Sequence, residues 1–122
     1  MNRLKDKKLF LLDMDGTLYL DDDLFPHVPE FLARVKETGG RYLFLTNNSG
    51  YTPCELKLKL ARMGLDVPEH HFYTSALATA AFLDSQRPGC TAYVIGEAAL
   101  SKALYDRGIY MNDVNPDYVV VG

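Results

Sequence analysis

Several features are scarce in this chain of 122 residues, which has no tryptophan, two cysteines, no run of Lys or Arg and no long apolar segment. No stretch approaches the roughly 20 apolar residues that a membrane-spanning helix needs, so we expect no membrane partner. The formal net charge is −3, and without a basic stripe nucleic acid is also a disfavoured partner. The polar, basic N-terminus lacks the apolar stretch of a signal peptide.

The two cysteines, Cys54 and Cys90, show no metal-ligand spacing. We therefore expect reduced thiols in a cytoplasmic protein. The chain does contain 48% hydrophobic and 24% charged residues over the length of one ordinary domain. This balance is typical of a soluble globular protein.

Short apolar runs alternate with helical patterns along the chain, with residues 20–27 as a loop or small flap. The pattern predicts strands at residues 8–14, 42–46, 72–74, 92–95 and 118–121, and helices at about 28–38, 53–63, 75–83 and 97–107. Ser75 is expected to cap the third helix. Residues 56–60 alternate like a strand, but Thr52-Pro-Cys-Glu55 is a capping box with proline at the first helical position, which favours a helix. The alternation of elements predicts a parallel α/β sheet with right-handed crossovers.

The segment 9–18 is the most informative part of the sequence, because an apolar run ends there in Asp13 and Asp15, followed by Gly16. Side chains alternate along a strand, so both acids leave the same face and Met14 points into the core. At ~3.3 Å per residue, the two Cα atoms are roughly 7 Å apart. Two carboxylates this close repel unless a cation or a shared proton relieves them, so the pair predicts a divalent metal site.

A second polar motif follows the strand 42–46, which ends in Thr46 and continues into Asn47 and Asn48. In parallel α/β sheets, ligands bind beyond the carboxyl ends of the strands. The aspartate pair and the Thr-Asn-Asn segment both follow strands, so we expect them to form one composite site.

The residues alone leave other interpretations open. Asp13 and Asp15 could be solvated acids at a strand end that runs into an Asp-Gly turn, and Thr46 could be a β-branched residue that closes a strand. Lys57 and Lys59 fall on an expected helix and are expected to be solvated. A receiver-type domain phosphorylated by a partner kinase is disfavoured, because Gly16-Thr17 directly follows the acid pair.

With both motifs together, the chain resembles the haloacid dehalogenase (HAD) superfamily of phosphohydrolases. The first HAD motif matches at residues 13–18 and the second at residues 43–49, where Thr-Asn-Asn is similar to subclass IIA, the p-nitrophenylphosphatase and sugar/nucleotide phosphatase group. Further agreement runs through residues 52–56, 74–76, 93–97 and 116–122. The resemblance implies a HAD-like Rossmannoid parallel sheet, with the start of an inserted α/β cap domain.

The resemblance also implies a role for each site residue. Asp13 is the implied nucleophile, which attacks phosphorus to give an aspartyl-phosphate, and Asp15 is the implied general acid and base. Mg²⁺ is the implied cofactor, with Asp13 and the main-chain carbonyl of Asp15 as its ligands. The implied phosphate-binding residues are Gly16, Thr46, Asn47 and Asn48.

Two parts of the family's site have no match in the chain. These are the lysine of the third motif and the acids of the fourth motif, which follow the cap in relatives. The resemblance implies that residues 1–87 are the N-terminal part of the catalytic core and that residues 88–122 begin the cap. The chain also ends on an apolar strand at residues 118–121. We therefore expect a piece of a longer gene product that lacks a complete site by itself.

The implied function is a Mg²⁺-dependent phosphatase for a small-molecule phosphate monoester. A homodimer through the cap is compatible with the family. The alternative is a non-catalytic phosphate-binding or regulatory domain on the same scaffold. The presence of both Asp13 and Asp15 argues against a degraded enzyme.

Overall fold

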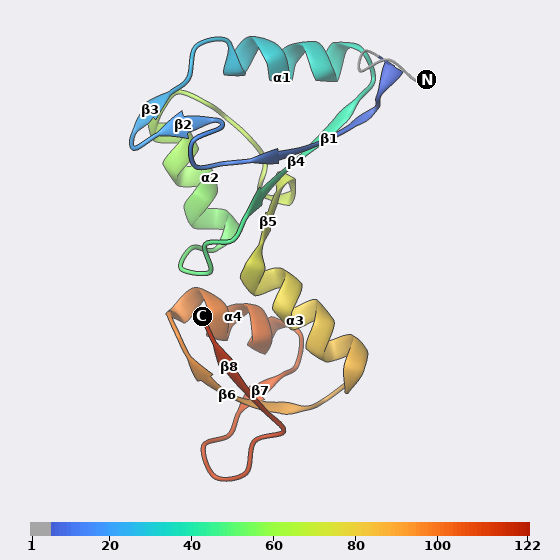
Figure 1. Ribbon diagram of the computed structural model, residues 1–122, viewed down its shortest axis with the longest axis vertical. Helices are drawn as coiled ribbons and strands as arrows, with labels where there is room; N and C mark the ends of the chain where they lie inside the picture. Colours follow the sequence, from blue (N-terminus) through green and yellow to red (C-terminus); the bar gives the residue numbers. More distant parts are fainter. Residues whose placement is uncertain (1–5) are drawn as a thin grey trace. The chain divides into compact units, whose positions relative to one another are not determined.

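The computed structural model describes residues 6–122, so the first five residues of the basic N-terminus lie outside the described part. The chain forms two compact units (Figure 1). The first unit contains the chain up to Thr46 together with Glu55–Tyr73, and the second contains Asn47–Cys54 and Thr74–Gly122. Within residues 6–122, no helix is long and apolar enough to cross a bilayer.

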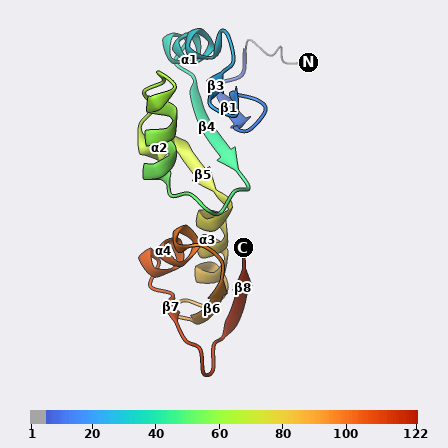
Figure 2. The same ribbon diagram turned by 90° about the vertical axis from the view of Figure 1, so that its left-hand side faces the viewer.

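The sheet of the first unit confirms the predicted strands, and each strand end lies within one residue of the predicted one. Strand β1 (Leu9–Asp13) pairs in parallel with β4 (Arg41–Thr46), and the register places Asp13 beside Leu45. Strand β5 (Phe72–Thr74) lies on the other side of β4 (Figure 2). Because β1 and β4 are adjacent and parallel, their carboxyl ends lie at one edge of the sheet.

Two helices accompany this sheet, α1 (Val28–Glu37) and α2 (Pro53–Arg62). The segment that alternates like a strand is helical, as the capping box predicted. A strand would place Leu56, Leu58 and Leu60 on one face, whereas the helix buries Leu56 and Leu60 and leaves Leu58 52% exposed. The buried leucines join a core that includes Phe44 and Met14.

Four short elements were not predicted individually. The segment 20–27, expected as a loop or small flap, overlaps a small antiparallel pair, β2 (Tyr19–Leu20) with β3 (Asp23–Leu24). A 3₁₀ turn, η2 (Glu69–His71), precedes β5, and β7 (Tyr110–Met111) lies in a segment without a strand pattern. Elements of two or three residues are too short to show a hydrophobic period.

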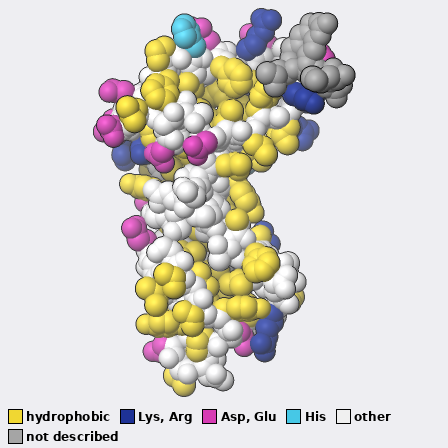
Figure 3. Space-filling model, in the orientation of Figure 1, with side chains coloured by type: hydrophobic (Ala, Val, Ile, Leu, Met, Phe, Trp, Pro, Cys, Tyr) yellow, Lys and Arg dark blue, Asp and Glu magenta, His cyan; other side chains and the backbone are white. Residues whose placement is uncertain are grey.

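The second unit has its own sheet, in which β6 (Thr91–Ile95) lies between β7 and β8 (Tyr118–Val121), and both pairings are parallel. Helices α3 (Ser75–Gln86) and α4 (Ala98–Asp106) pack on one face of it, where Ala92 belongs to the same buried cluster as Ala80 and Leu100. The alternate residues of β6 and β8 are exposed. Figure 3 shows apolar side chains at the surface of both units.

The cap of α3 differs from the expected one. Thr74, not Ser75, is the N-cap, because its hydroxyl accepts a hydrogen bond from the backbone N–H of Leu77 at 3.1 Å. The Ser75 hydroxyl instead donates to the carbonyl of Asn47 at 2.9 Å. Two adjacent hydroxyl residues fit a cap equally well by sequence, and the extended backbone of Thr74 decides between them.

Replacing Thr74 by valine is expected to lower the free energy of unfolding by ~1 kcal/mol, because the isosteric change removes the capping oxygen from a residue that is 2% exposed. Urea denaturation followed by circular dichroism measures the difference. Thr79→Val is the control, since that hydroxyl only donates to a carbonyl of its own helix, Ser75 O at 2.8 Å. An equal decrease in the free energy of unfolding in the two variants would contradict the capping role of Thr74.

Candidate active site

The aspartate pair lies where β1 ends. Asp13 is the last residue of β1, and Met14, which follows it, is 1% exposed in the core. Asp13 and Asp15 are both exposed. The predicted alternation is therefore present: the two carboxylates reach solvent while the residue between them anchors the segment.

The backbone after Asp13 is organised by a tight loop. Gly16 has φ of +78°, a conformation that glycine adopts without a steric penalty. Its N–H donates to the carbonyl of Tyr19 at 2.8 Å, and the N–H of Leu18 donates to the carbonyl of Met14 at 2.9 Å. Leu18 and Tyr19 are 3% and 2% exposed, so these two side chains of the loop pack in the core while Asp15 remains at the surface.

Thr46 occupies the matching position on the neighbouring strand. It is the last residue of β4, one residue beyond Leu45, the register partner of Asp13. Adjacent strands lie about 4.8 Å apart, so Thr46 and the aspartate pair share the carboxyl edge of the β1–β4 pair. Thr46 is 8% exposed, which makes it one of the two buried polar residues found in the described part of the chain.

Asn47 and Asn48 continue the chain directly from Thr46 and belong to the second compact unit. Both residues are exposed. The side-chain oxygen of Asn48 accepts a hydrogen bond from the N–H of Gly50 at 2.8 Å, and the carbonyl of Asn47 accepts from the Ser75 hydroxyl. These bonds give Asn47 and Asn48 a defined local conformation within that unit.

Lys59 is not fully solvated, contrary to the expectation. Lys57 and Lys59 are both partly buried. The ammonium of Lys59 lies 4.7 Å from the centre of the Tyr19 ring, over its face, which is a cation–π arrangement. Tyr19 therefore links α2 to the loop that carries Asp15, and the sequence pattern had no signal for this contact because it joins residues forty positions apart.

The site supplies oxygen donors of the kind that Mg²⁺ prefers, namely the carboxylates of Asp13 and Asp15 together with the main-chain carbonyls beside them. Within residues 6–122, however, no three His, Cys, Asp or Glu side chains are grouped so that they could hold a metal ion. The donor chemistry thus fits a hard divalent cation, and the pair accounts for only part of its ligands.

The protein is a parallel α/β protein with exposed aspartates at the last residue of β1 and two positions further on, and with a buried threonine at the end of β4. These polar groups lie beyond the carboxyl ends of parallel strands, where α/β proteins bind ligands. Comparison with known proteins identifies the family. The family model described as haloacid dehalogenase-like hydrolase matches residues 10–110. The chain belongs to the haloacid dehalogenase-like hydrolases.

Individual relatives agree with this assignment. Dihydroxyacetone phosphatase from Corynebacterium glutamicum (strain R) is 42% identical over 113 residues, which cover 93% of this chain and 41% of the relative. Ribonucleotide monophosphatase NagD from Escherichia coli (strain K12) is 44% identical over 115 residues, covering 94% of this chain and 46% of the relative. The crystal structure of 4-nitrophenylphosphatase from Thermotoga maritima matches with a TM-score of 0.91 at 40% identity, covering 95% of this chain and 44% of that one.

These relatives are phosphatases of the group that the Thr-Asn-Asn motif indicated, so the predicted family and the predicted fold class are confirmed. The chain spans a little under half the length of the relatives it matches.

Proposed function

We propose that this chain supplies the nucleophile-bearing part of a Mg²⁺-dependent phosphatase that acts through an aspartyl-phosphate. The observation that carries the proposal is the joint placement of Asp13, Asp15 and Thr46 at one edge of the β1–β4 pair. The relatives at about 40% identity are phosphatases, which supports the same reaction class.

In the proposed reaction, Asp13 is the nucleophile. A carboxylate is already ionised at neutral pH, so Asp13 needs no base before its oxygen bonds to phosphorus and the ester oxygen departs. Asp15 donates a proton to that leaving oxygen, then takes a proton from the water that hydrolyses the aspartyl-phosphate. Positioned proton transfer of this kind contributes roughly 10²–10⁴-fold to the rate.

The surrounding residues bind the phosphoryl group and the metal. Mg²⁺, when bound, offsets the repulsion between the anionic phosphate and the carboxylates, and Asp13 with the carbonyl of Asp15 would hold it. Gly16 has no Cβ, so its backbone leaves room beside the phosphate. The hydroxyl of Thr46 and the amides of Asn47 and Asn48 are the proposed donors to phosphoryl oxygens.

The division into core and cap is also a proposal. We place the boundary near residue 88, so that residues 1–87 belong to the core and residues 88–122 open the cap. The second compact unit has other bounds, because it contains Asn47–Cys54 as well as Thr74–Gly122. Its longer stretch starts at Thr74, where Ala76 and Ala80 of α3 belong to the same buried cluster as Ala92 of β6. Helix α3 would then connect the catalytic edge to the cap.

The substrate, the cellular location and the oligomeric state are also proposed. The substrate class is a small-molecule phosphate monoester, in line with the names of the relatives. We propose a cytoplasmic location, which the two unpaired thiols, Cys54 and Cys90, support. A homodimer through the cap is proposed on the family resemblance alone.

The test uses the chain alone and a fusion to the part of Escherichia coli NagD that follows the matched region. The fusion is expected to release p-nitrophenolate from p-nitrophenyl phosphate with Mg²⁺ and to lose this activity in EDTA. The chain of 122 residues alone is expected to show no turnover above background, because a third-motif lysine and fourth-motif acids have no counterpart in it.

Two outcomes would contradict the proposal. Robust Mg²⁺-dependent turnover by the chain alone would show that no further residues are needed. A fusion that unfolds cooperatively but stays inactive would favour the alternative, a phosphate-binding domain without catalysis.

A further inference from the structure

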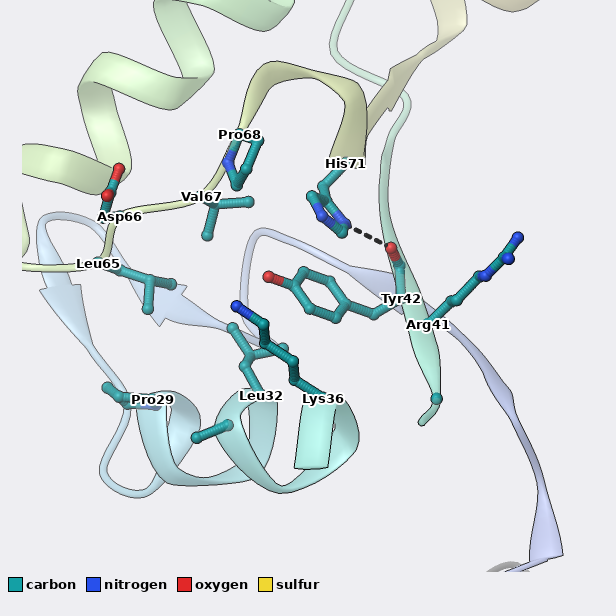
Figure 4. A pocket seen from close by; sticks show the side chains of 12 residues that line it. Pro29, Leu32, Lys36, Arg41, Tyr42, Leu65, Asp66, Val67, Pro68 and His71 are labelled. Carbon is teal, nitrogen blue, oxygen red and sulfur yellow. Dashed lines mark hydrogen bonds between the residues drawn. The ribbon is translucent and has the colours of Figure 1, made fainter. Parts of the chain in front are cut away.

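The first unit contains a pocket that the proposed chemistry does not use. It has a volume of about 380 Å³ and is formed by α1, the start of β4 and residues 65–71 (Figure 4). That volume falls in the range of small-molecule sites, roughly 300–1,000 Å³. Its walls include the apolar side chains of Leu32, Leu65 and Val67.

The pocket lies away from the aspartate pair. Tyr42, which lines it, is the second residue of β4 and pairs with Phe10, whereas Asp13 and Thr46 lie at the other ends of the two strands. At ~3.3 Å per residue, three to four positions along the strands separate the two places by about 10–13 Å. A molecule in this pocket would not occupy the site of phosphoryl transfer.

Tyr42 is held in place by His71. The Nδ1 of His71 hydrogen-bonds to the carbonyl oxygen of Tyr42 at 2.8 Å, so this nitrogen carries the proton and donates it. The two rings stack with centroids 4.2 Å apart and an interplanar angle of 20°. This leaves the phenol end of Tyr42 directed into the pocket (Figure 4).

Two hydrogen-bond donors face the same part of the pocket. Figure 4 shows the ammonium of Lys36 and the hydroxyl of Tyr42 directed toward it, while the guanidinium of Arg41 points away. Across residues 6–122, Lys36 makes no ion pair and the Tyr42 hydroxyl makes no hydrogen bond. Burial raises the pKa of the Tyr42 phenol, so the hydroxyl keeps its proton and can donate.

The charged side chains at the pocket limit the chemical class of ligand that it can bind. Lys36 supplies one positive charge at the donor end, and Asp66 adds a negative charge to the lining. Asp66 repels any anion, but it repels a doubly charged phosphate more than a single carboxylate, whose one charge is matched by Lys36 and the Tyr42 hydroxyl. The apolar side chains of the walls favour an apolar ring over a sugar, whose hydroxyl groups would lose hydrogen bonds to water there.

We propose that this pocket binds a small aromatic carboxylate. The carboxylate accepts hydrogen bonds from the ammonium of Lys36 and the hydroxyl of Tyr42, and the ring lies against Leu32, Leu65 and Val67. This site is separate from the proposed phosphatase site and does not depend on it.

The experiment adds 2-naphthoate to the isotope-labelled chain of 122 residues and follows its NMR spectra. We expect saturable shifts at Leu32, Val67 and His71, and nuclear Overhauser effects from the naphthalene protons to the methyl groups of Leu32, Leu65 and Val67. The uncharged analogue 2-naphthamide is expected to bind at least tenfold more weakly, because it cannot make the charge-assisted hydrogen bond to Lys36.

Variants on one helix separate the proposed contact from a general charge effect. Lys36→Gln is expected to weaken 2-naphthoate binding roughly tenfold or more. Arg34→Gln is the matched control, because it removes the same charge from α1 at a residue that does not line the pocket. Ala33→Phe places a ring into the pocket from an exposed helix position and is expected to abolish the Overhauser effects without lowering the unfolding midpoint.

Three results would overturn the proposal. The first is 2-naphthoate shifts confined to residues outside the pocket, such as the exposed strand residues Tyr93 and Val119. The second is an equal loss of affinity in Lys36→Gln and Arg34→Gln. The third is unchanged binding by a folded Ala33→Phe variant.

Discussion

Replacing Asp13 by asparagine is expected to lower the rate of p-nitrophenyl phosphate hydrolysis by the NagD fusion by more than about 10³-fold, because the amide cannot attack phosphorus. The side chains have nearly the same shape, and Asp13 is exposed at the end of β1, so the fold should be unaffected. Steady-state rates with Mg²⁺, together with mass spectrometry of acid-quenched protein for a phosphoryl adduct, measure the effect. No adduct is expected in the variant.

Asp15→Asn is the matched control for the assignment of roles. The leaving group p-nitrophenolate needs little protonation, so Asp13 should still be phosphorylated in this variant. Hydrolysis of the adduct should be slow because the general base is gone, and the phosphoryl adduct should accumulate. An adduct that persists in Asp13→Asn, or one located on another residue, would contradict the proposed nucleophile.

Replacing Phe44 by alanine is expected to lower the free energy of unfolding of the first unit by about 3–5 kcal/mol. Phe44 is 0% exposed on the middle strand of the β1-β4-β5 sheet, and its ring lies 5.2 Å from that of Tyr42 and 5.4 Å from that of Phe72. Natural domains are stable by only about 5–15 kcal/mol, so the variant should be largely unfolded at moderate urea concentration. Urea titration monitored by far-UV circular dichroism measures the change.

Phe82→Ala is the control for Phe44→Ala, because Phe82 is 61% exposed and loses little buried contact. Its effect on the free energy of unfolding is expected to stay within about 0.5 kcal/mol. Similar shifts of the urea midpoint in the two variants would show that Phe44 is not at the centre of the core.

Much of the secondary structure follows from local pattern. The strand-like alternation of Leu56, Leu58 and Leu60 was outweighed by the capping box before it, and the helix α2 confirms that choice. The cap of α3 shows the limit of such arguments, because Thr74 and Ser75 carry the same hydroxyl. The backbone conformation selects Thr74, and no local propensity distinguishes them.

The aspartate pair was also predictable, since the two-residue period of a strand places Asp13 and Asp15 on the same side for any strand that ends there. Their roles in catalysis stay predictions. The position of Thr46 beside the aspartate pair depends on which strands are neighbours, and the pairing of β1 with β4 makes them neighbours. The contact between Lys59 and Tyr19 could not be predicted, because it depends on how α2 packs beside the loop after β1.

The sequence by itself determined the longer strands and helices, the shared side of the Asp13–Asp15 pair and the family, because each of these depends on residues that are close in the chain. Only the tertiary structure decided which distant residues share a surface. The stacking of Tyr42 on His71 and the direction of Lys36 into the same pocket are the clearest case. These contacts bring together α1, β4 and the segment before β5. Contacts between separate elements leave no periodic pattern in the sequence, so the sequence could not predict them.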